Sequence, residues 1–262
     1  MNDIPEVYDK SSYLEWHNKF LENGRDLQTS VDAMRESLRV GLRDQVEQLG
    51  QLLLFIKGRT EPECRLTTGG LVLASFEINI NDFTSDEARG INERLLKSTD
   101  SIIEKIWRKN RAAAKPYVTS ENISEHISDL VRTSVVCPTL FHAKEFAKRL
   151  KNWEAFTSEN DDNRNRFPNI KNIRVDEEVK AASGYFAYHG LVDFDDDNKV
   201  EVQLYSSISQ AWRSVSHRLY ERSRITGTPY LTPGSSEARL ISLGHLLHLA
   251  ENELDRLMQE IQ

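Results

Sequence analysis

Two strand-like stretches in the second half of the chain carry polar side chains that can do chemistry. Residues 200–205 alternate, so a strand would point Glu201 and Gln203 to one face and its apolar residues to the other. Residues 185–194 alternate in the same way and put Tyr185 and His189 on one face. A carboxylate, an imidazole and an aromatic ring on one surface are groups that can bind and activate a substrate. We therefore place the chemistry here.

The run between these stretches predicts a β-hairpin. Residues 193–198 include three consecutive aspartates and an asparagine, which favour turns. Two antiparallel strands joined there would present Tyr185, His189 and Glu201 together. The structural alternative is a half-buried strand tyrosine beside a histidine that satisfies its own hydrogen bonds.

A stripe of cations supplies a second signal. At helical spacing within residues 86–111, one narrow face holds Arg94, Lys97, Ser101, Lys105 and Arg108. Aligned cations repel one another, so such a helix is expected to face an anion, for example a polyphosphate. The alternative is an ordinary solvated basic face.

An acidic residue stands at the start of a predicted central strand. Residues 127–137 form a β-branched run typical of a buried strand, and Asp129 lies near its beginning. A carboxylate there is costly unless it is paired, hydrogen-bonded or bound to a metal.

The order of these residues resembles the synthetase signature of the RelA/SpoT family. The resemblance rests on Gly184-Tyr185 with Tyr188-His189, then Glu201-Val202-Gln203-Leu204, then Trp212 and His217. Upstream, Lys97-Ser98, Ser101 and Lys105 resemble the family's ATP-side helix, and Asp129-Leu130 matches the start of its D-L-x-G-x-R strand. The similarity spans residues 94–220. The departures are Arg132 where glycine is common, Ser134 where arginine is common and Phe186 where a basic residue is common.

The resemblance implies an ATP-dependent pyrophosphokinase of the GTP diphosphokinase class. Asp129 and Glu201 would hold Mg²⁺, and Glu201 would also accept the proton of the acceptor's ribose 3′-hydroxyl. The ATP phosphates would contact Lys97, Ser101 and Lys105, while Arg94 or Arg132 would stack on adenine, although Arg94 is one residue off the family's spacing. On the acceptor side, Tyr185 would stack on the base, with His189 and Gln203 positioning acceptor groups.

The acceptor stays open at this point. Guanine nucleotides come first, with transfer of the β,γ-pyrophosphate of ATP to the 3′-hydroxyl of GDP or GTP to make the alarmone (p)ppGpp of the stringent response. The alternative is a toxin-type synthetase that uses an adenine nucleotide or the tRNA 3′ end, and such a toxin could have an antitoxin protein as partner. A third possibility is an inactive nucleotide-binding regulatory module. No histidine is followed by aspartate, so the family's hydrolase motif is absent and a small stand-alone synthetase is expected.

Helical periodicity predicts most of the remaining elements. A short helix should end near Asn23-Gly24, followed by one long amphipathic helix over residues 27–56. Further helices are expected over 140–153, over 206–222 with Ile208, Trp212, Val215 and Leu219 inward, and over 240–261 with a heptad spacing; residues 170–176 should form a short strand, and residues 58–85 stay unassigned.

These elements predict an α+β fold. A mixed central β-sheet flanked by helices, similar to a nucleotidyltransferase, would carry long N- and C-terminal helices. The expected domains are an N-terminal helical region (1–85), the synthetase domain (86–225) and a C-terminal helix (226–262). The apolar faces of the terminal helices exceed what one small sheet covers, so we expect a homo-oligomer.

Composition restricts the class of protein. The chain has 262 residues, of which 39% are hydrophobic and 29% charged, and its net charge of −7 argues against general nucleic-acid coating. No apolar run approaches the roughly 20 residues of a membrane span, and the first residues lack signal-peptide features, so we expect a cytoplasmic protein without membrane contact. Cys64 and Cys137 are expected to be reduced thiols.

Overall fold

The chain forms two compact units that interleave along the sequence. The computed structural model describes residues 4–67, 76–78, 83–85, 90–112, 116–158, 166–180, 184–226 and 234–260. The first unit comprises Met1–Val46 with Asn81–Arg132, and the second comprises Glu47–Ile80 with Thr133–Gln262. The three domain ranges expected from the sequence do not follow these boundaries and stay a prediction.

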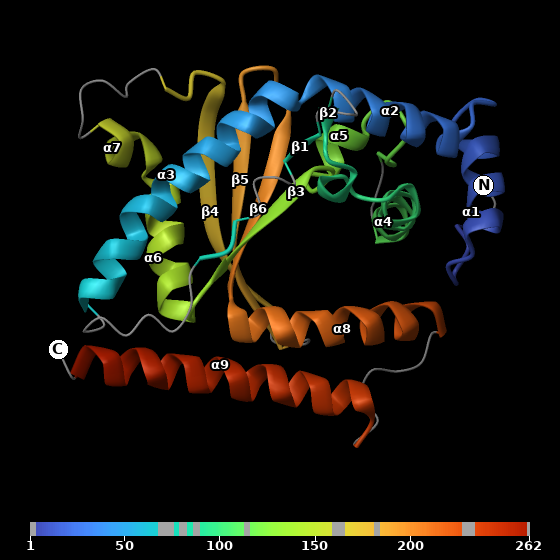
Figure 1. Cartoon of the computed structure of the whole chain (residues 1–262). Helices are drawn as coiled ribbons and strands as arrows, with labels where there is room; N and C mark the ends of the chain where they lie inside the picture. The colour runs from blue at the N-terminus through green and yellow to red at the C-terminus, as the bar shows by residue number, and fades with distance from the viewer. Residues whose placement is uncertain are drawn as a thin grey trace. The chain divides into compact units, whose positions relative to one another are not determined.

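The first unit is mainly helical. Its helices are α1 (Lys10–Phe20), α2 (Leu27–Gly41), α4 (Thr99–Ala112) and α5 (Ile123–His126), with the short strands β1 (Thr84–Ser85) and β2 (Gly90–Ile91) and the 3₁₀ turn η2 (Glu93–Leu95) (Figure 1). Asp26 caps α2 by accepting a hydrogen bond from the Thr29 amide at 2.7 Å. The apolar faces of α1, α2 and α4 share a buried core that includes Tyr13, Leu27, Val31, Ile102 and Ile106.

The sequence prediction for the N-terminal helices is partly wrong. The first helix is followed by a turn in which Asn23 and Gly24 have positive φ values, as predicted. The stretch 27–56, however, holds two helices, because α2 ends at Gly41 and α3 (Arg43–Thr67) begins after Leu42. Leu42 is fully buried, so the apolar spacing continues across the break and the periodicity could not show it.

The cationic stripe is not a single helical face, which corrects the prediction for residues 86–111. Helix α4 begins only at Thr99, so it carries Ser101, Lys105 and Arg108, whereas Arg94 lies in η2 and Lys97 follows it in extended chain. The Asn92 side chain caps η2, and Leu96 then forms a β-bridge with Val131 that draws the chain out of helical conformation.

The second unit contains a four-stranded mixed sheet, which confirms the predicted α+β class. Its strands are β3 (Arg132–Cys137), β4 (Ile170–Lys180), β5 (Tyr185–Phe194) and β6 (Lys199–Ser206), in the order β3-β6-β5-β4. Strand β5 runs antiparallel to both β4 and β6. The β5–β6 hairpin has its turn where the aspartate run predicted it, with Asp197 in the left-handed region at φ 62°. Strand β4 is longer than the predicted strand 170–176. Asp129 lies in the turn before β3.

Helices close one face of this sheet. Helix α6 (Leu140–Lys151) contacts β4, β5 and β6, and a short helix α7 (Trp153–Ser158) follows it, so the predicted helix 140–153 ends before Trp153 (Figure 1). Gly190 gives α6 its close approach, because a Cβ atom there would lie 3.1 Å from the Leu150 side chain. The buried residues on this face are Ile173, Val175, Val192, Phe194, Val200, Val202 and Leu204. The opposite face carries polar side chains together with a small buried cluster of Val136, Ala187 and Tyr205.

Helices α8 (Ser207–Thr226) and α9 (Ser236–Glu260) run side by side (Figure 1). Ser206 caps α8 by accepting a hydrogen bond from the Ser209 amide at 3.0 Å. Trp212 is buried, and its indole donates to the Leu240 carbonyl at 2.9 Å. The inward placement predicted for Ile208 and Val215 is wrong, since they are 40% and 53% exposed. An apolar stripe identifies a face of a helix and does not show how far its neighbour covers that face.

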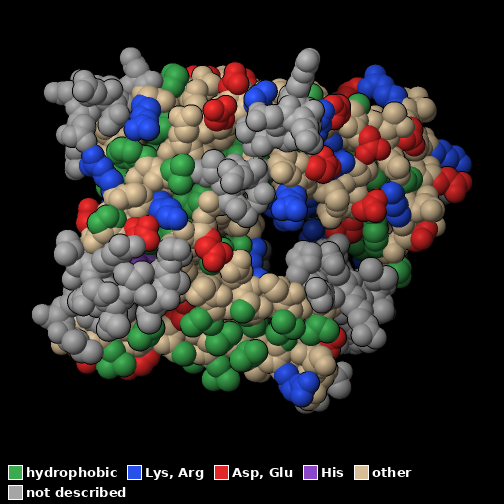
Figure 2. Space-filling model, viewed as in Figure 1, with side chains coloured by type: hydrophobic (Ala, Val, Ile, Leu, Met, Phe, Trp, Pro, Cys, Tyr) green, Lys and Arg blue, Asp and Glu red, His purple; other side chains and the backbone are tan. Residues whose placement is uncertain are grey.

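Helix α9 leaves a row of leucines on the surface. Hydrophobic side chains gather over this helix in Figure 2, and the exposed residues are Leu243, Leu246, Leu249, Leu254 and Leu257. The homo-oligomer expected from the heptad spacing stays a prediction. In the described part of the chain, no helix is both long and apolar enough to span a membrane.

Two glycines bring α9 into backbone contact with the start of β5. Gly184 has a φ of +68°, and a Cβ atom on it would lie 2.7 Å from the Ile241 carbonyl oxygen. A Cβ atom on Gly244 would overlap the Gly184 carbonyl oxygen and lie 3.0 Å from the Trp212 ring. This contact supports the strand that begins with Tyr185.

We expect Gly244→Ala to lower the free energy of unfolding by about 1–3 kcal/mol, because the added methyl group has backbone on one side and an indole on the other. The matched control is Gly58→Ala in α3, where a Cβ atom meets nothing within 4 Å. There the better helix propensity of alanine should leave stability unchanged or raise it by up to about 1 kcal/mol. Urea denaturation of both variants checks this, and equal effects would contradict the packing described for Gly244.

Candidate active site

The first unit gathers an aspartate and two lysines, which we call the lysine–aspartate cluster. Lys97 Nζ donates to Asp129 Oδ2 at 2.9 Å, and Lys105 Nζ donates to Asp129 Oδ1 at 2.7 Å. The Lys97 amide also donates to the Leu130 carbonyl at 2.9 Å, which fixes the segment before α4 beside the turn that carries Asp129. The cluster thus joins residues from three separate stretches of chain.

Charge compensation keeps Asp129 ionised. Burial alone would raise the pKa of Asp129, but the hydrogen bonds and charges of Lys105 and Lys97 outweigh burial and lower its pKa to about 2. Burial lowers the pKa of Lys97 from its usual range, and Asp129 opposes that effect. One carboxylate therefore balances two partly buried ammonium groups.

An arginine that the sequence did not single out supports this cluster. Arg35 on α2 donates from Nε to the Lys97 carbonyl at 2.8 Å and from Nη1 to Thr99 Oγ1 at 3.3 Å. Ser101 lies in the first turn of α4, where its hydroxyl accepts from Ser98 Oγ at 2.9 Å. The spacing of Arg35 along its helix does not indicate this role, because only the fold brings it to Lys97.

The second unit gathers the predicted acceptor residues on the polar face of the sheet, and we call this group the sheet-face cluster. His189 pairs with Gln203 across β5 and β6, and Leu191 pairs with Glu201. His189 Nε2 lies 2.8 Å from Tyr185 Oη, and Nδ1 lies 3.5 Å from Glu201 Oε1. The Gln203 amide donates to Glu201. The hairpin register therefore produces the grouping that the alternation predicted.

Two further residues complete the sheet-face cluster. Glu178 on β4 places Oε2 2.8 Å from His189 Nε2. Arg213 on α8 donates from Nη1 to Tyr185 Oη at 2.8 Å and from Nη2 to Gln203 Oε1 at 2.5 Å. Sequence reasoning missed both. Extending the alternation of β4 past Asp176 would have found Glu178, and Arg213 directly follows the Trp212 of the motif.

The tyrosine of this cluster stays neutral at physiological pH. Burial raises the pKa of Tyr185 to about 12, with the charges of Glu178 and Glu201 adding to the effect and Arg213 opposing it. Its ring lies edge-on to His189, with centroids 5.9 Å apart. The Tyr185 hydroxyl is therefore available as a hydrogen-bonding group and not as a phenolate.

The chain is similar in structure to a small alarmone synthetase. One match is to the crystal structure of small alarmone synthetase 1 from Bacillus subtilis, with a TM-score of 0.42 and 20% sequence identity over 64% of this chain and 77% of that chain. No protein-family model matches the chain, and no curated protein sequence matches it.

The predicted site residues fall into two groups, one in each unit. Asp129, Lys97 and Lys105 meet in the first, and Tyr185, His189, Glu201 and Gln203 meet in the second. Arg94 in η2 and Arg132 at the start of β3 are exposed, and their predicted stacking on adenine stays a prediction. The side chain of His217 lies outside the described residues.

The two predicted Mg²⁺ ligands, Asp129 and Glu201, belong to different units. Carboxylate oxygens are the protein ligands that Mg²⁺ prefers. Within the described parts of the two units, no group of three or more histidine, cysteine or acidic side chains gathers as a metal site. Both oxygens of Asp129 accept hydrogen bonds from lysines, and Glu201 accepts one from Gln203. Magnesium binding therefore stays a prediction for Asp129 and Glu201.

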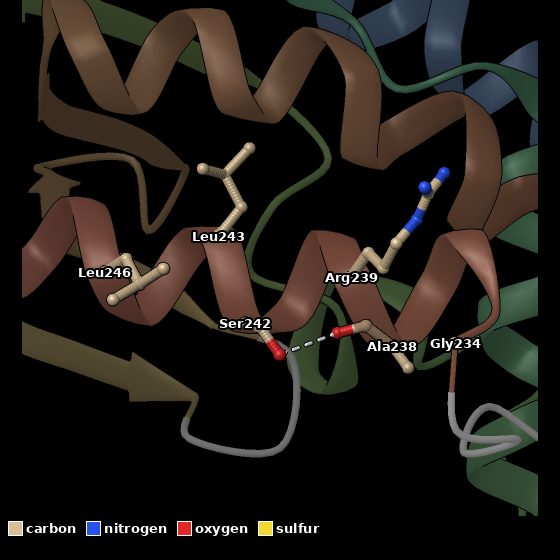
Figure 3. A pocket seen from close by; sticks show the side chains of 6 residues that line it. All are labelled: Gly234, Ala238, Arg239, Ser242, Leu243 and Leu246. Atoms are coloured by element: carbon tan, nitrogen blue, oxygen red, sulfur yellow. Dashed lines mark hydrogen bonds between the residues drawn. The ribbon is translucent and has the colours of Figure 1, made fainter.

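The second unit has a surface pocket along α9. It follows the first turns of α9 and is lined by Gly234, Ala238, Arg239, Ser242, Leu243 and Leu246 (Figure 3). Its serine hydroxyl already donates to the Ala238 carbonyl at 3.0 Å. None of the predicted site residues lines this pocket, so we place no chemistry there.

We expect Asp129→Asn to destabilise the protein by about 2–4 kcal/mol near neutral pH, because it leaves two partly buried lysines without a counterion. The folded-state pKa of Asp129 is about 2 and its ordinary value is 3.8. The stabilisation is therefore present above about pH 4 and is lost as the pH falls towards 2. Urea unfolding at several pH values should show that the difference in the free energy of unfolding between wild type and variant becomes smaller as the pH falls over this range.

The matched control is Asp100→Asn, since Asp100 also pairs with a lysine, Lys10, but its side chain is 75% exposed. It should change stability by less than about 1 kcal/mol. A cost for Asp129→Asn no larger than this control, or one independent of pH, would contradict the ion-pair assignment.

Proposed function

We propose that the protein is an ATP-dependent 3′-pyrophosphokinase that transfers the β,γ-pyrophosphate of ATP to the ribose 3′-hydroxyl of GDP or GTP. The sheet-face cluster carries this proposal. Two motif pieces that resemble the RelA/SpoT synthetase signature, Tyr185 with His189 and Glu201 with Gln203, are separate in sequence and adjacent in the hairpin.

The lysine–aspartate cluster is proposed as the ATP side. Lys97 and Lys105 carry the charge that a triphosphate needs, and Ser101 lies at the N-terminal turn of α4, where backbone amides favour anions. When phosphate oxygens accept the lysine hydrogen bonds, the oxygens of Asp129 lose those partners. Arg94 or Arg132 would then hold adenine by stacking, since a guanidinium plane suits an aromatic base.

The sheet-face cluster is proposed as the acceptor side. Tyr185 stacks on the acceptor base, while His189 and Gln203 position the acceptor by hydrogen bonds. Glu201 accepts the proton of the 3′-hydroxyl as its oxygen attacks the β-phosphorus of ATP, and the bond from that phosphorus to the α,β-bridging oxygen breaks to release AMP. Bound Mg²⁺, held by Asp129 and Glu201, would supply neutralisation of the negative charge on the transferred group.

A second acceptor class follows from the departures from the family pattern. Phe186, which stands where a basic residue is common, lies on the opposite strand face and stacks on His248 with ring centroids 3.6 Å apart. With Arg132 and Ser134, this favours a divergent member, so an adenine nucleotide or the tRNA 3′ end comes second, the latter with an antitoxin as possible partner. The inactive regulatory module ranks third because Asp129 and Glu201 are both retained.

The direct test of the acceptor is label transfer from γ-labelled ATP with Mg²⁺. Separate reactions contain GDP, GTP, ADP or deacylated tRNA. We expect label on GDP or GTP. Label on ADP or tRNA alone would select the second class, and label on none of them would contradict the proposed function.

Glu201→Gln should lower the transfer rate by roughly 10²–10⁴, because it keeps the volume and removes the charge that accepts the proton. The matched control is Glu177→Gln on β4, whose pairing with Tyr188 places it on the other strand face. The control should transfer at the wild-type rate. A Glu201→Gln transfer rate within a few-fold of the wild-type rate would contradict the role of Glu201 as proton acceptor.

Tyr185→Ala should raise the KM for the acceptor and leave that for ATP nearly unchanged, since a stack between a base and an aromatic ring is worth roughly 1–3 kcal/mol. Tyr185→Phe keeps the ring and should retain more acceptor affinity. Steady-state kinetics with each substrate varied in turn separates the two effects. An equal rise for both substrates would show that Tyr185 is structural.

A further inference from the structure

Arg213 is a partly buried cation whose described contacts are with neutral groups. Its guanidinium carbon lies 4.2 Å from the ring centroid of Tyr205 and 5.0 Å from that of Tyr185. Its two hydrogen bonds go to the Tyr185 hydroxyl and to the Gln203 side-chain oxygen. The two rings and two hydrogen bonds fix both the position and the plane of the guanidinium.

The charge of Arg213 has no counterion among the described residues. The two carboxylates of the sheet-face cluster contact other residues, Glu178 contacting His189 and Glu201 contacting Gln203 and His189. A guanidinium has five N–H donors, and the contacts with Tyr185 and Gln203 use two of them. A partly buried charge without a counterion is unfavourable, so the arrangement suits an anion that arrives with the substrate.

The fixed fork indicates which anion fits. A planar guanidinium binds the oxygens of a phosphate group through two parallel hydrogen bonds, and it loses little entropy when packing already holds it. Its partner Tyr185 is the residue proposed to stack on the acceptor base. A phosphate of the same acceptor would therefore lie within reach of Arg213.

We propose that Arg213 binds a phosphate of a mononucleotide acceptor and so selects nucleoside phosphates over nucleosides. This rests on the proposed function, because it takes Tyr185 as the acceptor-base residue. A nucleic acid is a poorer fit. Neutralising several backbone phosphates needs several cations, whereas the residues described for the sheet-face cluster include one arginine and two carboxylates, in a chain with a net charge of −7.

The experiment measures dissociation constants for GDP, guanosine, ADP and adenosine by calorimetry, with wild type and Arg213→Gln. The variant should weaken binding of the preferred nucleoside diphosphate by about tenfold to a hundredfold, the range for a lost charge-assisted hydrogen bond. Binding of the matching nucleoside should change by less than about threefold. Equal weakening of both ligands would mean that Arg213 only positions Tyr185 and Gln203, and would overturn the inference.

Two further variants keep the test decisive. Arg174→Gln removes an exposed arginine of β4 that pairs with Asp193 at 3.3 Å, and it should bind all four ligands as wild type does. Arg213→Lys keeps the charge and loses the fork, so it should give an intermediate diphosphate affinity, and it replaces Arg213→Gln if that variant does not fold. Circular dichroism checks folding.

The outcomes separate this inference from the proposed function. Suppose that Arg213→Gln changes the ratio of the dissociation constants for the diphosphate and the nucleoside, while the wild-type protein transfers no label. That result would support the phosphate site and overturn the proposed pyrophosphokinase activity. Label transfer by the wild type, with an unchanged ratio of dissociation constants in Arg213→Gln, would support the proposed activity and overturn the phosphate site. Wild-type binding of deacylated tRNA with a steep salt dependence, and of no mononucleotide, would overturn the inference.

Discussion

The register of the β5–β6 hairpin is the constraint on which the candidate chemistry depends. Side chains alternate along a strand, so a slip of one residue would turn Glu201, Gln203 and His189 towards α6 and bring apolar residues to the polar face. The burial of Val192, Val200 and Val202 against the helices fixes the register from the other side. The apolar core thus determines which polar groups meet.

Each unit handles charge in a different way. In the first, Asp129 balances Lys97 and Lys105 within the protein, so ligand phosphates must compete for the same hydrogen bonds. In the second, Arg213 contacts neutral groups while Glu178 and Glu201 flank His189. The lysine–aspartate cluster is suited to exchanging the Asp129 carboxylate for a ligand phosphate. The sheet-face cluster is suited to binding a ligand phosphate at Arg213.

Local patterns in the sequence predicted what local physics determines. Strict alternation gave both strands of the hairpin and the grouping of Tyr185, His189 and Glu201, and the aspartate run gave the turn. Asp129 was expected to need a partner, and the partners are lysines that the sequence had assigned to an ATP-binding helix. Lys97 is not helical, because the β-bridge between Leu96 and Val131 overrides the helical spacing. Arg213 could not be predicted as a partner, since only the placement of α8 brings it to the cluster, whereas the alternation of β4, extended past Asp176, indicates Glu178.

The proposed transfer breaks the bond between the α,β-bridging oxygen and the β-phosphorus of ATP. Phosphorus NMR of the reaction with ATP, Mg²⁺ and GDP tests it most directly. The account predicts that AMP accumulates in a one-to-one ratio with GDP carrying a new diphosphate on its 3′ oxygen. Formation of ADP with a singly phosphorylated acceptor, or of AMP with free pyrophosphate, would contradict it.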